Sequence, residues 1–171
     1  MKNNRAKNIG ITFATFALLM AAAVQTSLNA QNRLDLGILT QSANRIVGAW
    51  ETTVTPRNCD TGEQVGPPFM GVSTYNEGGT LAEFGANPTT PYRTPGHGIW
   101  SGDGRGNYTM KFSFLPLTPA GVPIGRMRVS QTIELSRFSD EMSSSGGFAL
   151  TNFAGVVIAV GCSTATAVRL N

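Results

Sequence analysis

From Ile46 onward, apolar and polar residues alternate with a period of two, and groups of glycine, proline and asparagine interrupt the alternation at short intervals. This period is typical of strands with one packed face and one solvated face, and the interruptions are turn signals. Short connections between successive strands predict an antiparallel meander. We expect eight strands, at 46–55, 70–75, 80–84, 97–101, 108–114, 126–135, 141–151 and 156–170.

The two ends of this region carry features that match each other. Cys59 and Trp50 lie near its start, and Cys162 and Arg169 lie near its end. Residues paired in an antiparallel ladder have a constant sum of residue numbers, and the sums for Cys59 with Cys162 and for Trp50 with Arg169 differ by only two. We therefore expect the first and last strands to be neighbours. The predicted fold is all-β, an eight-stranded antiparallel up-and-down barrel without exposed sheet edges.

The first 30 residues have the pattern of a secretory signal peptide. Lys2, Arg5 and Lys7 precede an apolar run at 9–24, and a polar stretch then ends at the small residue Ala30. The run is shorter than the roughly 20 residues of a membrane span, although an uncleaved anchor is the alternative. We expect an exported protein, periplasmic or extracellular, with no stable membrane span once processed. Residues 31–45 are then a lead-in segment, and 46–171 the barrel domain.

Charge and cysteine content narrow the possible partners. Three of the thirteen basic residues and none of the ten acidic residues lie in the first 30, so the remaining chain has no net charge. This argues against nucleic acid or an anionic membrane as a partner. In an oxidising compartment two cysteines are expected to form one disulfide, here Cys59–Cys162, with two unpaired thiols as the alternative. No metal motif is present in the sequence, and we expect no cofactor.

Gly48-Ala49-Trp50 and the late Arg169 resemble the signature of the calycin superfamily, which includes lipocalins, avidins and fatty-acid-binding proteins. The resemblance implies that the tryptophan closes the narrow end of a barrel and that the arginine lies across its ring. The segments 54–59, 66–69, 95–100 and 131–135 also resemble those of small exported bacterial proteins without an assigned function, which implies a fold and a compartment only.

The parity of the last strand makes a further prediction. If Trp50 faces inward, the inward positions of that strand are small, at Gly161, Ser163, Ala165 and Ala167. Small inward residues leave room for a ligand. The opposite face is apolar, at Ile158, Val160, Cys162, Val168 and Leu170. Either a bulge near Gly161 exchanges the faces, or a partner subunit covers an apolar outer surface, which makes a homo-oligomer possible.

Six residues are candidates for ligand binding: His97, Trp100, Tyr108, Met110, Phe112 and Phe114. The single histidine has flanking glycines and could ligate haem iron or donate a proton, but an isolated histidine is more often structural. The alternating aromatic strand could line a pocket or fill a core, since a barrel of eight strands accommodates both.

The carboxylates within strands have an ordinary explanation. Glu51, Glu83 and Glu134 are expected to face water or to pair with a cation such as Arg126 or Arg128. The glycine-rich segment 102–106 lacks the strand-to-helix setting of a phosphate-binding loop, so we expect a hairpin there.

These features favour an exported barrel that binds a small, mostly apolar ligand, entered beside the proline-rich loop 85–95. No catalytic residue can be assigned. Two alternatives remain open: an enzyme of the barrel cyclase or isomerase type, and a structural or oligomeric module without a ligand.

Overall fold

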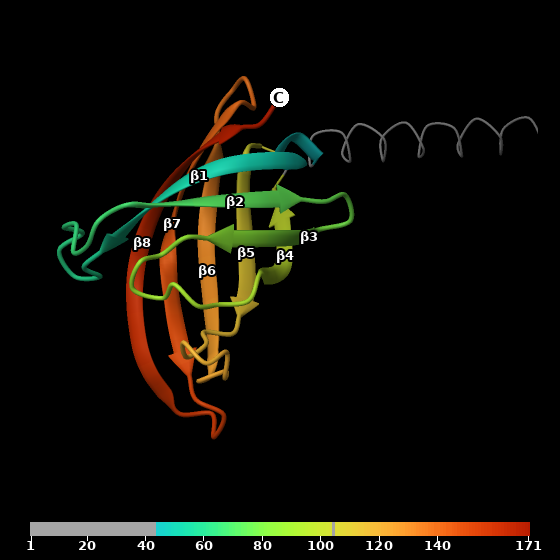
Figure 1. Ribbon diagram of the computed structural model, residues 1–171. Helices are drawn as coiled ribbons and strands as arrows, with labels where there is room; N and C mark the ends of the chain where they lie inside the picture. The colour runs from blue at the N-terminus through green and yellow to red at the C-terminus, as the bar shows by residue number, and fades with distance from the viewer. Residues whose placement is uncertain (1–43, 104) are drawn as a thin grey trace, which may run out of the picture. The chain divides into compact units, whose positions relative to one another are not determined.

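The computed structural model describes residues 44–103 and 105–171 (Figure 1). The predicted signal peptide at 1–30 and most of the lead-in segment lie outside the described residues. A short 3-10 helix comes first and eight strands follow: η1 (Asn44–Ile46), β1 (Gly48–Arg57), β2 (Phe69–Tyr75), β3 (Thr80–Gly85), β4 (Gly96–Gly102), β5 (Asn107–Phe114), β6 (Arg126–Leu135), β7 (Glu141–Thr151) and β8 (Val157–Arg169).

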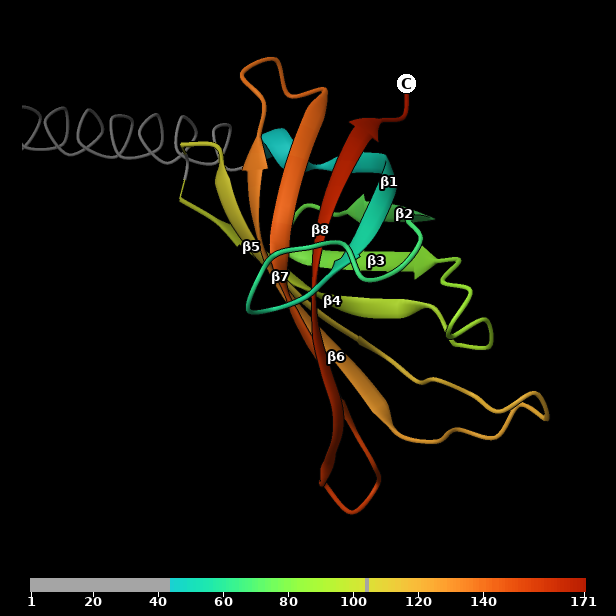
Figure 2. The same cartoon turned by 90° about the vertical axis from the view of Figure 1, so that its left-hand side faces the viewer.

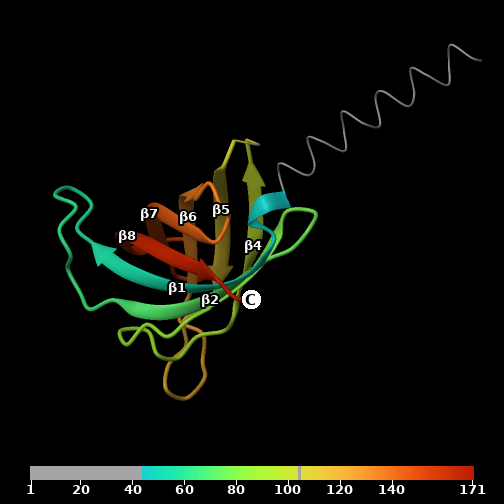
Figure 3. The ribbon, with the colours of Figure 1, turned by 90° about the horizontal axis from the view of Figure 1, so that it is seen from above.

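The strands form a closed barrel in sequence order, and each strand is antiparallel to its neighbours. β1 also pairs with β8, in a register that runs from Trp50 opposite Arg169 to Arg57 opposite Cys162. Figure 3 shows this contact from above, with β1 and β8 side by side. The predicted fold class, an all-β up-and-down barrel, is confirmed.

β1 lies two residues later than the sequence predicted: it starts at Gly48 rather than Ile46, and it continues through Pro56 to Arg57 rather than ending at Thr55. Pairing between β1 and β2 stops at Val54 opposite Phe69, whereas pairing with β8 continues through Pro56 opposite Ser163. On its other side this segment no longer pairs with β2, but Arg57 forms an isolated bridge with Gln64 and the Pro56 carbonyl accepts from Val65 N–H at 3.1 Å. A proline is tolerated there because its missing N–H need not belong to a ladder bond.

Large side chains close one end of the barrel, where β1, β3, β5 and β7 begin. The core cluster there contains Ile46, Trp50, Tyr75, Leu81, Trp100, Tyr108, Ile133, Met142 and Ala167. The indole nitrogens within it are satisfied: Trp50 Nε1 donates to the Ile46 carbonyl at 2.9 Å, and Trp100 Nε1 donates to the Asn76 and Thr80 carbonyls. This end is a dry, filled core rather than a channel.

Arg169 secures the closed end from outside. Its guanidinium lies 4.3 Å from the centre of the Trp50 ring and donates to the carbonyls of Ser139, Val47 and Arg45 at 2.7, 2.7 and 2.6 Å. Gly48 has a φ of 137°, which strongly favours glycine, and a Cβ there would meet the Arg169 guanidinium. This explains why a glycine precedes the tryptophan by two residues.

The disulfide forms as predicted. Cys59, in the β1–β2 loop, is bonded to Cys162 of β8 with a Cα–Cα distance of 5.2 Å. The bond ties the loop to the strand beside β1, at the end of the barrel opposite the core cluster. A disulfide is consistent with an oxidising compartment.

The outer face of β8 is apolar and exposed. Val160 and Ile158 are 70% and 53% exposed. The alternation of faces continues unbroken through Gly161, and the register shift occurs further along, where Thr151 of β7 pairs with Val157. The alternative of a face-switching bulge near Gly161 is therefore wrong. Within the described residues, no helix is long and apolar enough to cross a membrane.

A candidate ligand cavity at the open end of the barrel

The half of the barrel away from the core cluster contains a cavity of about 400 Å³. Its floor includes Tyr75, Met142 and Ala167, which belong to the core cluster below. Above it lie residues 65–67 of the β1–β2 loop and residues 87–90 of the β3–β4 loop. This volume falls within the range of small-molecule sites, which is roughly 300–1,000 Å³.

Aromatic and sulfur-containing side chains make up much of the wall. They come from four strands and are Phe69, Met110, Phe112, Phe114, Met127 and Phe148. Small residues of β8 complete it, namely Ser163, Ala165 and Ala167. These positions were predicted from parity to leave room inside the barrel, and the cavity lies against them.

Glycines on the inner face determine where the rings lie. A Cβ on Gly98 would collide with the Phe112 backbone and its Cβ, and a Cβ on Gly161 would collide with the Phe148 ring. The rings of Phe112 and Phe114 are stacked, with centroids 6.4 Å apart. A side chain at either glycine would push its ring toward the cavity, so the glycines preserve its volume.

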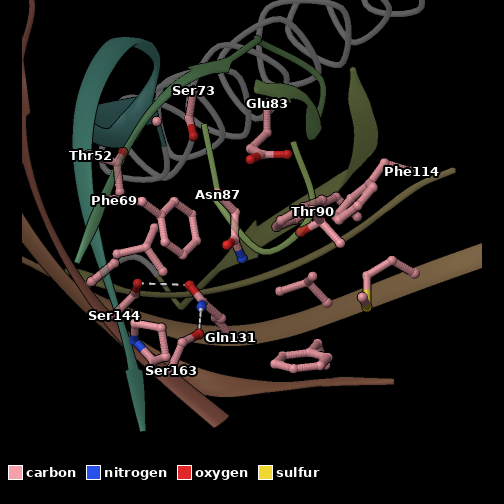
Figure 4. Close-up of a pocket in the computed structure, with 18 of the residues that line it drawn as sticks. Thr52, Phe69, Ser73, Glu83, Asn87, Thr90, Phe114, Gln131, Ser144 and Ser163 are labelled. Atoms are coloured by element: carbon pink, nitrogen blue, oxygen red, sulfur yellow. Dashed lines mark hydrogen bonds between the residues drawn. The ribbon is translucent and has the colours of Figure 1, made fainter. Parts of the chain in front are cut away.

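A hydrogen-bonded polar group is set into this apolar wall (Figure 4). Gln131, 6% exposed, donates from Nε2 to Ser163 Oγ at 3.0 Å and accepts at Oε1 from Ser144 Oγ at 2.8 Å. β6, β7 and β8 each contribute one of these residues, and all three line the cavity. After these two bonds the Ser163 hydroxyl can still donate, and Ser144 Oγ can still accept.

Two more hydroxyl side chains line the cavity from β1 and β2. Thr52 of β1 and Ser73 of β2 line the cavity. Among the described residues, Thr52 Oγ1 is buried without a hydrogen-bond partner. Figure 4 shows these two residues across the cavity from Gln131 and its serines.

An ion pair lies at the mouth. Both Arg93 Nη atoms donate to the Glu83 carboxylate, at 3.2 and 2.5 Å, and the two side chains are 4% and 13% exposed. The Arg93 guanidinium also lies 3.5 Å from the centre of the Phe114 ring. Because Arg93 belongs to the β3–β4 loop, the pair fastens this loop over the cavity. Glu83 therefore has a dedicated cationic partner, which was one of the two expectations, but the partner is Arg93 rather than Arg126 or Arg128, and the Glu83 side chain lines the cavity.

The structure separates the six predicted ligand-binding residues into three groups. Met110, Phe112 and Phe114 line the cavity. Trp100 and Tyr108 belong to the core cluster below it, with ring centroids 5.8 Å apart. His97 is exposed on the outer face of β4 and is not part of the cavity. We leave it out of the site proposed below.

Several residues of the site were not predicted from the sequence. Gln131, Ser144 and Ser163 occur on three different strands, and Arg93 lies in a loop without periodicity. For Gln131 the available signal was its parity, since it is a polar residue on an otherwise apolar strand face. Among the described residues, no group of three or more histidine, cysteine, aspartate or glutamate side chains is arranged to hold a metal ion.

Comparison with known proteins gives distant structural similarity only. No protein-family model matches the chain, and no curated protein matches it significantly. The crystal structure of Rv2717c from M. tuberculosis is similar at 13% sequence identity and a TM-score of 0.36, over 74% of this chain and 94% of that chain. A similarity of this size carries no argument about the site. Membership of the calycin superfamily therefore stays a prediction.

Proposed function

We propose that this protein is an exported binding barrel for a small, uncharged, mostly apolar molecule that carries one hydrogen-bonding group. The observation that supports this best is the cavity of about 400 Å³, enclosed by apolar side chains and covered by two loops. At about 30 Å³ for each water-sized group, this volume accommodates a ligand of roughly 13 non-hydrogen atoms. The calycin-like closure by Trp50 and Arg169 is consistent with such a role.

The charges around the cavity favour an uncharged ligand. Glu83 and Arg93 are the charged residues that line it, and each neutralises the other. A carboxylate ligand would have to displace Glu83 from Arg93 or enter an apolar space without a counter-ion, and either is costly. An ammonium ligand would likewise have to displace Arg93 from Glu83 or enter the apolar space without a counter-ion.

The polar group on the wall supports a ligand with a hydroxyl, carbonyl or amide. Ser163 offers a donor and Ser144 offers an acceptor, beside each other on Gln131. A ligand without a polar group would leave both without a partner, and a neutral hydrogen bond is typically worth a factor of a few to about tenfold in affinity.

Calorimetric titration with three probes of similar size tests this proposal. We expect 1-octanol to bind at least tenfold more tightly than octanoate, which is ionised at neutral pH. Gln131→Leu should weaken the binding of 1-octanol by about fivefold to tenfold. It should not change the binding of ethylbenzene, which has no polar group.

Filling the cavity provides the matched control. Ala165 faces the cavity and Ala149 lies on the outer face of the adjacent strand β7. Ala165→Phe should abolish binding of 1-octanol and of ethylbenzene, whereas Ala149→Phe should retain both. The proposal fails if no probe binds, or if the two variants bind equally well.

A further inference from the structure

The turn between β7 and β8 presents apolar side chains to solvent beyond the open end of the barrel. Phe153 at the turn is 72% exposed, and the start of β8 adds Val157, Ile158 and Val160 at 55%, 53% and 70%. In Figures 1 and 2 this hairpin extends furthest from the barrel on its side. We call these residues of the turn and of the start of β8 the apolar tip: Phe153, Val156, Val157, Ile158 and Val160.

The tip is held in shape by hydrogen bonds rather than by packing. Asn152 Oδ1 accepts from the backbone N–H groups of Ala154 and Val156, both at 3.0 Å, and Asn152 N–H donates to the Val156 carbonyl. Phe153 is therefore fixed at the end of the turn.

Cations accompany the apolar tip on the outer surface. Arg126 of β6 lies opposite Thr151 of β7, at the base of the tip. Arg128 lies opposite Ala149 of β7, which in turn lies opposite Val160 of β8. Both arginines are exposed. Of the carboxylates on these strands, Glu134 and Glu141 lie at the closed end.

Asp60 and Glu63, also at the open end, lie in the β1–β2 loop, which Figure 1 shows apart from the tip. Glu83 at the mouth is neutralised by Arg93. The zero net charge of residues 31–171 therefore does not exclude a surface on which apolar and basic side chains are adjacent.

This combination fits a lipid surface better than a second copy of the chain. A stable protein interface takes roughly 20 to 30 residues from each partner, and the apolar tip has only five. A narrow projection that is apolar on both of its faces can be surrounded by acyl chains, while arginines beside it contact anionic headgroups.

We propose that the apolar tip inserts into the interfacial region of an anionic membrane, with Arg126 and Arg128 against the headgroups. Phe148, Leu150 and Ala159, at the base of the same hairpin, line the cavity. Docking in this way brings the cavity close to the lipid, which is a reservoir of small apolar molecules. The docking itself depends on the hairpin alone, so it stands or fails independently of ligand binding.

Partition of the full chain into vesicles of phosphatidylcholine and phosphatidylglycerol tests the proposal. Phe138 is a matched control, because it is 84% exposed in the β6–β7 loop at the closed end. Phe153→Ser should lower the partition coefficient about tenfold or more, and Phe138→Ser should leave it unchanged. Each variant shares residues 1–43 with the unchanged chain, so the differences report on the altered positions.

Two further measurements complete the experiment. Arg126→Gln and Arg128→Gln should each weaken binding to the anionic vesicles by about fivefold, and should not change binding to pure phosphatidylcholine. A tryptophan introduced as Phe153→Trp should be quenched by brominated lipid, unlike one introduced as Phe138→Trp. The proposal is overturned if both serine variants behave alike, or if Phe153→Ser dissociates a dimer without changing partition.

Discussion

Arg169 of the last strand lies directly opposite Trp50 of the first, and its guanidinium stacks 4.3 Å from the centre of the indole ring. The same guanidinium donates to three backbone carbonyls that belong to η1, the segment before β1 and the β6–β7 loop. The Arg169 side chain thus connects the first and last strands to η1 and to the β6–β7 loop at the closed end of the barrel.

Replacing this arginine should destabilise the barrel even when the charge is kept. Arg169→Lys loses the planar group that donates in three directions, and we expect the free energy of unfolding to fall by about 3 kcal/mol. Urea denaturation measures the change. Arg137→Lys, at an exposed position in the β6–β7 loop, should change stability by less than about 0.5 kcal/mol. Equal effects would contradict the role given to Arg169.

Loss of the disulfide should act mainly through the unfolded chain. The bond joins residues 103 positions apart, for which chain entropy gives up to roughly 4.7 kcal/mol and practice gives about 2–4. We expect the double variant Cys59→Ala with Cys162→Ala to lose about 3 kcal/mol in urea denaturation and to keep the far-ultraviolet spectrum of the barrel. Reductant should destabilise the unchanged chain but leave the double variant unaffected.

Breaking the ion pair at the mouth should be costly because it leaves a buried charge. Glu83→Gln removes the partner of Arg93, whose side chain is 4% exposed, and should lower the free energy of unfolding by about 3 kcal/mol. Glu134→Gln, an exposed glutamate on the outer face of β6, is the control and should be nearly neutral. Faster proteolysis within the β3–β4 loop of Glu83→Gln would show that the pair fastens this loop.

Stability should fall in alkaline solution because of Tyr75. Burial, and then the negative charge of Glu83, raise the pKa of Tyr75 well above its usual value of 10.0. Its hydroxyl donates to Met110 Sδ at 3.1 Å. Below pH 10 both folded and unfolded chains keep the phenol proton. Above it the unfolded chain ionises first, which costs up to about 1.4 kcal/mol of stability per pH unit.

Denaturation between about pH 9 and pH 11 measures this loss. Tyr75→Phe should flatten the decline in part, since burial also raises the pKa of Tyr108. Tyr92→Phe, at an exposed position, should leave the decline as steep as in the unchanged chain. A decline that is identical in all three proteins would show that Tyr75 is not its source.

The barrel could be predicted from the sequence because its determinants are periodic or paired. Alternation located the strands, and the matching positions of Trp50 with Arg169 and Cys59 with Cys162 identified the neighbours that close the sheet. These signals depend on backbone geometry, in which inward and outward positions strictly alternate. Both the alternation and the paired positions can therefore be recognised in the sequence.

The site was only partly predictable, because inward parity is the same for a filled core and for a cavity. Met110 and Tyr108 share one face of β5, yet Met110 lines the cavity and Tyr108 packs in the core below it. Whether an inward residue packs in the core or lines the cavity depends on its position along the barrel axis. The alternation of the sequence does not give that position. The partner of Glu83 was missed because Arg93 reaches it from an irregular loop.

The central claim is that small apolar molecules occupy the space between the core cluster and the two covering loops. Intermolecular nuclear Overhauser effects between 1-octanol and protein methyl groups test it most directly. The account predicts effects from the alkyl chain to Met110, Met127 and Ala165, which line the cavity. Effects confined to exposed methyl groups such as Val72 and Ile99, or none at all, would contradict it.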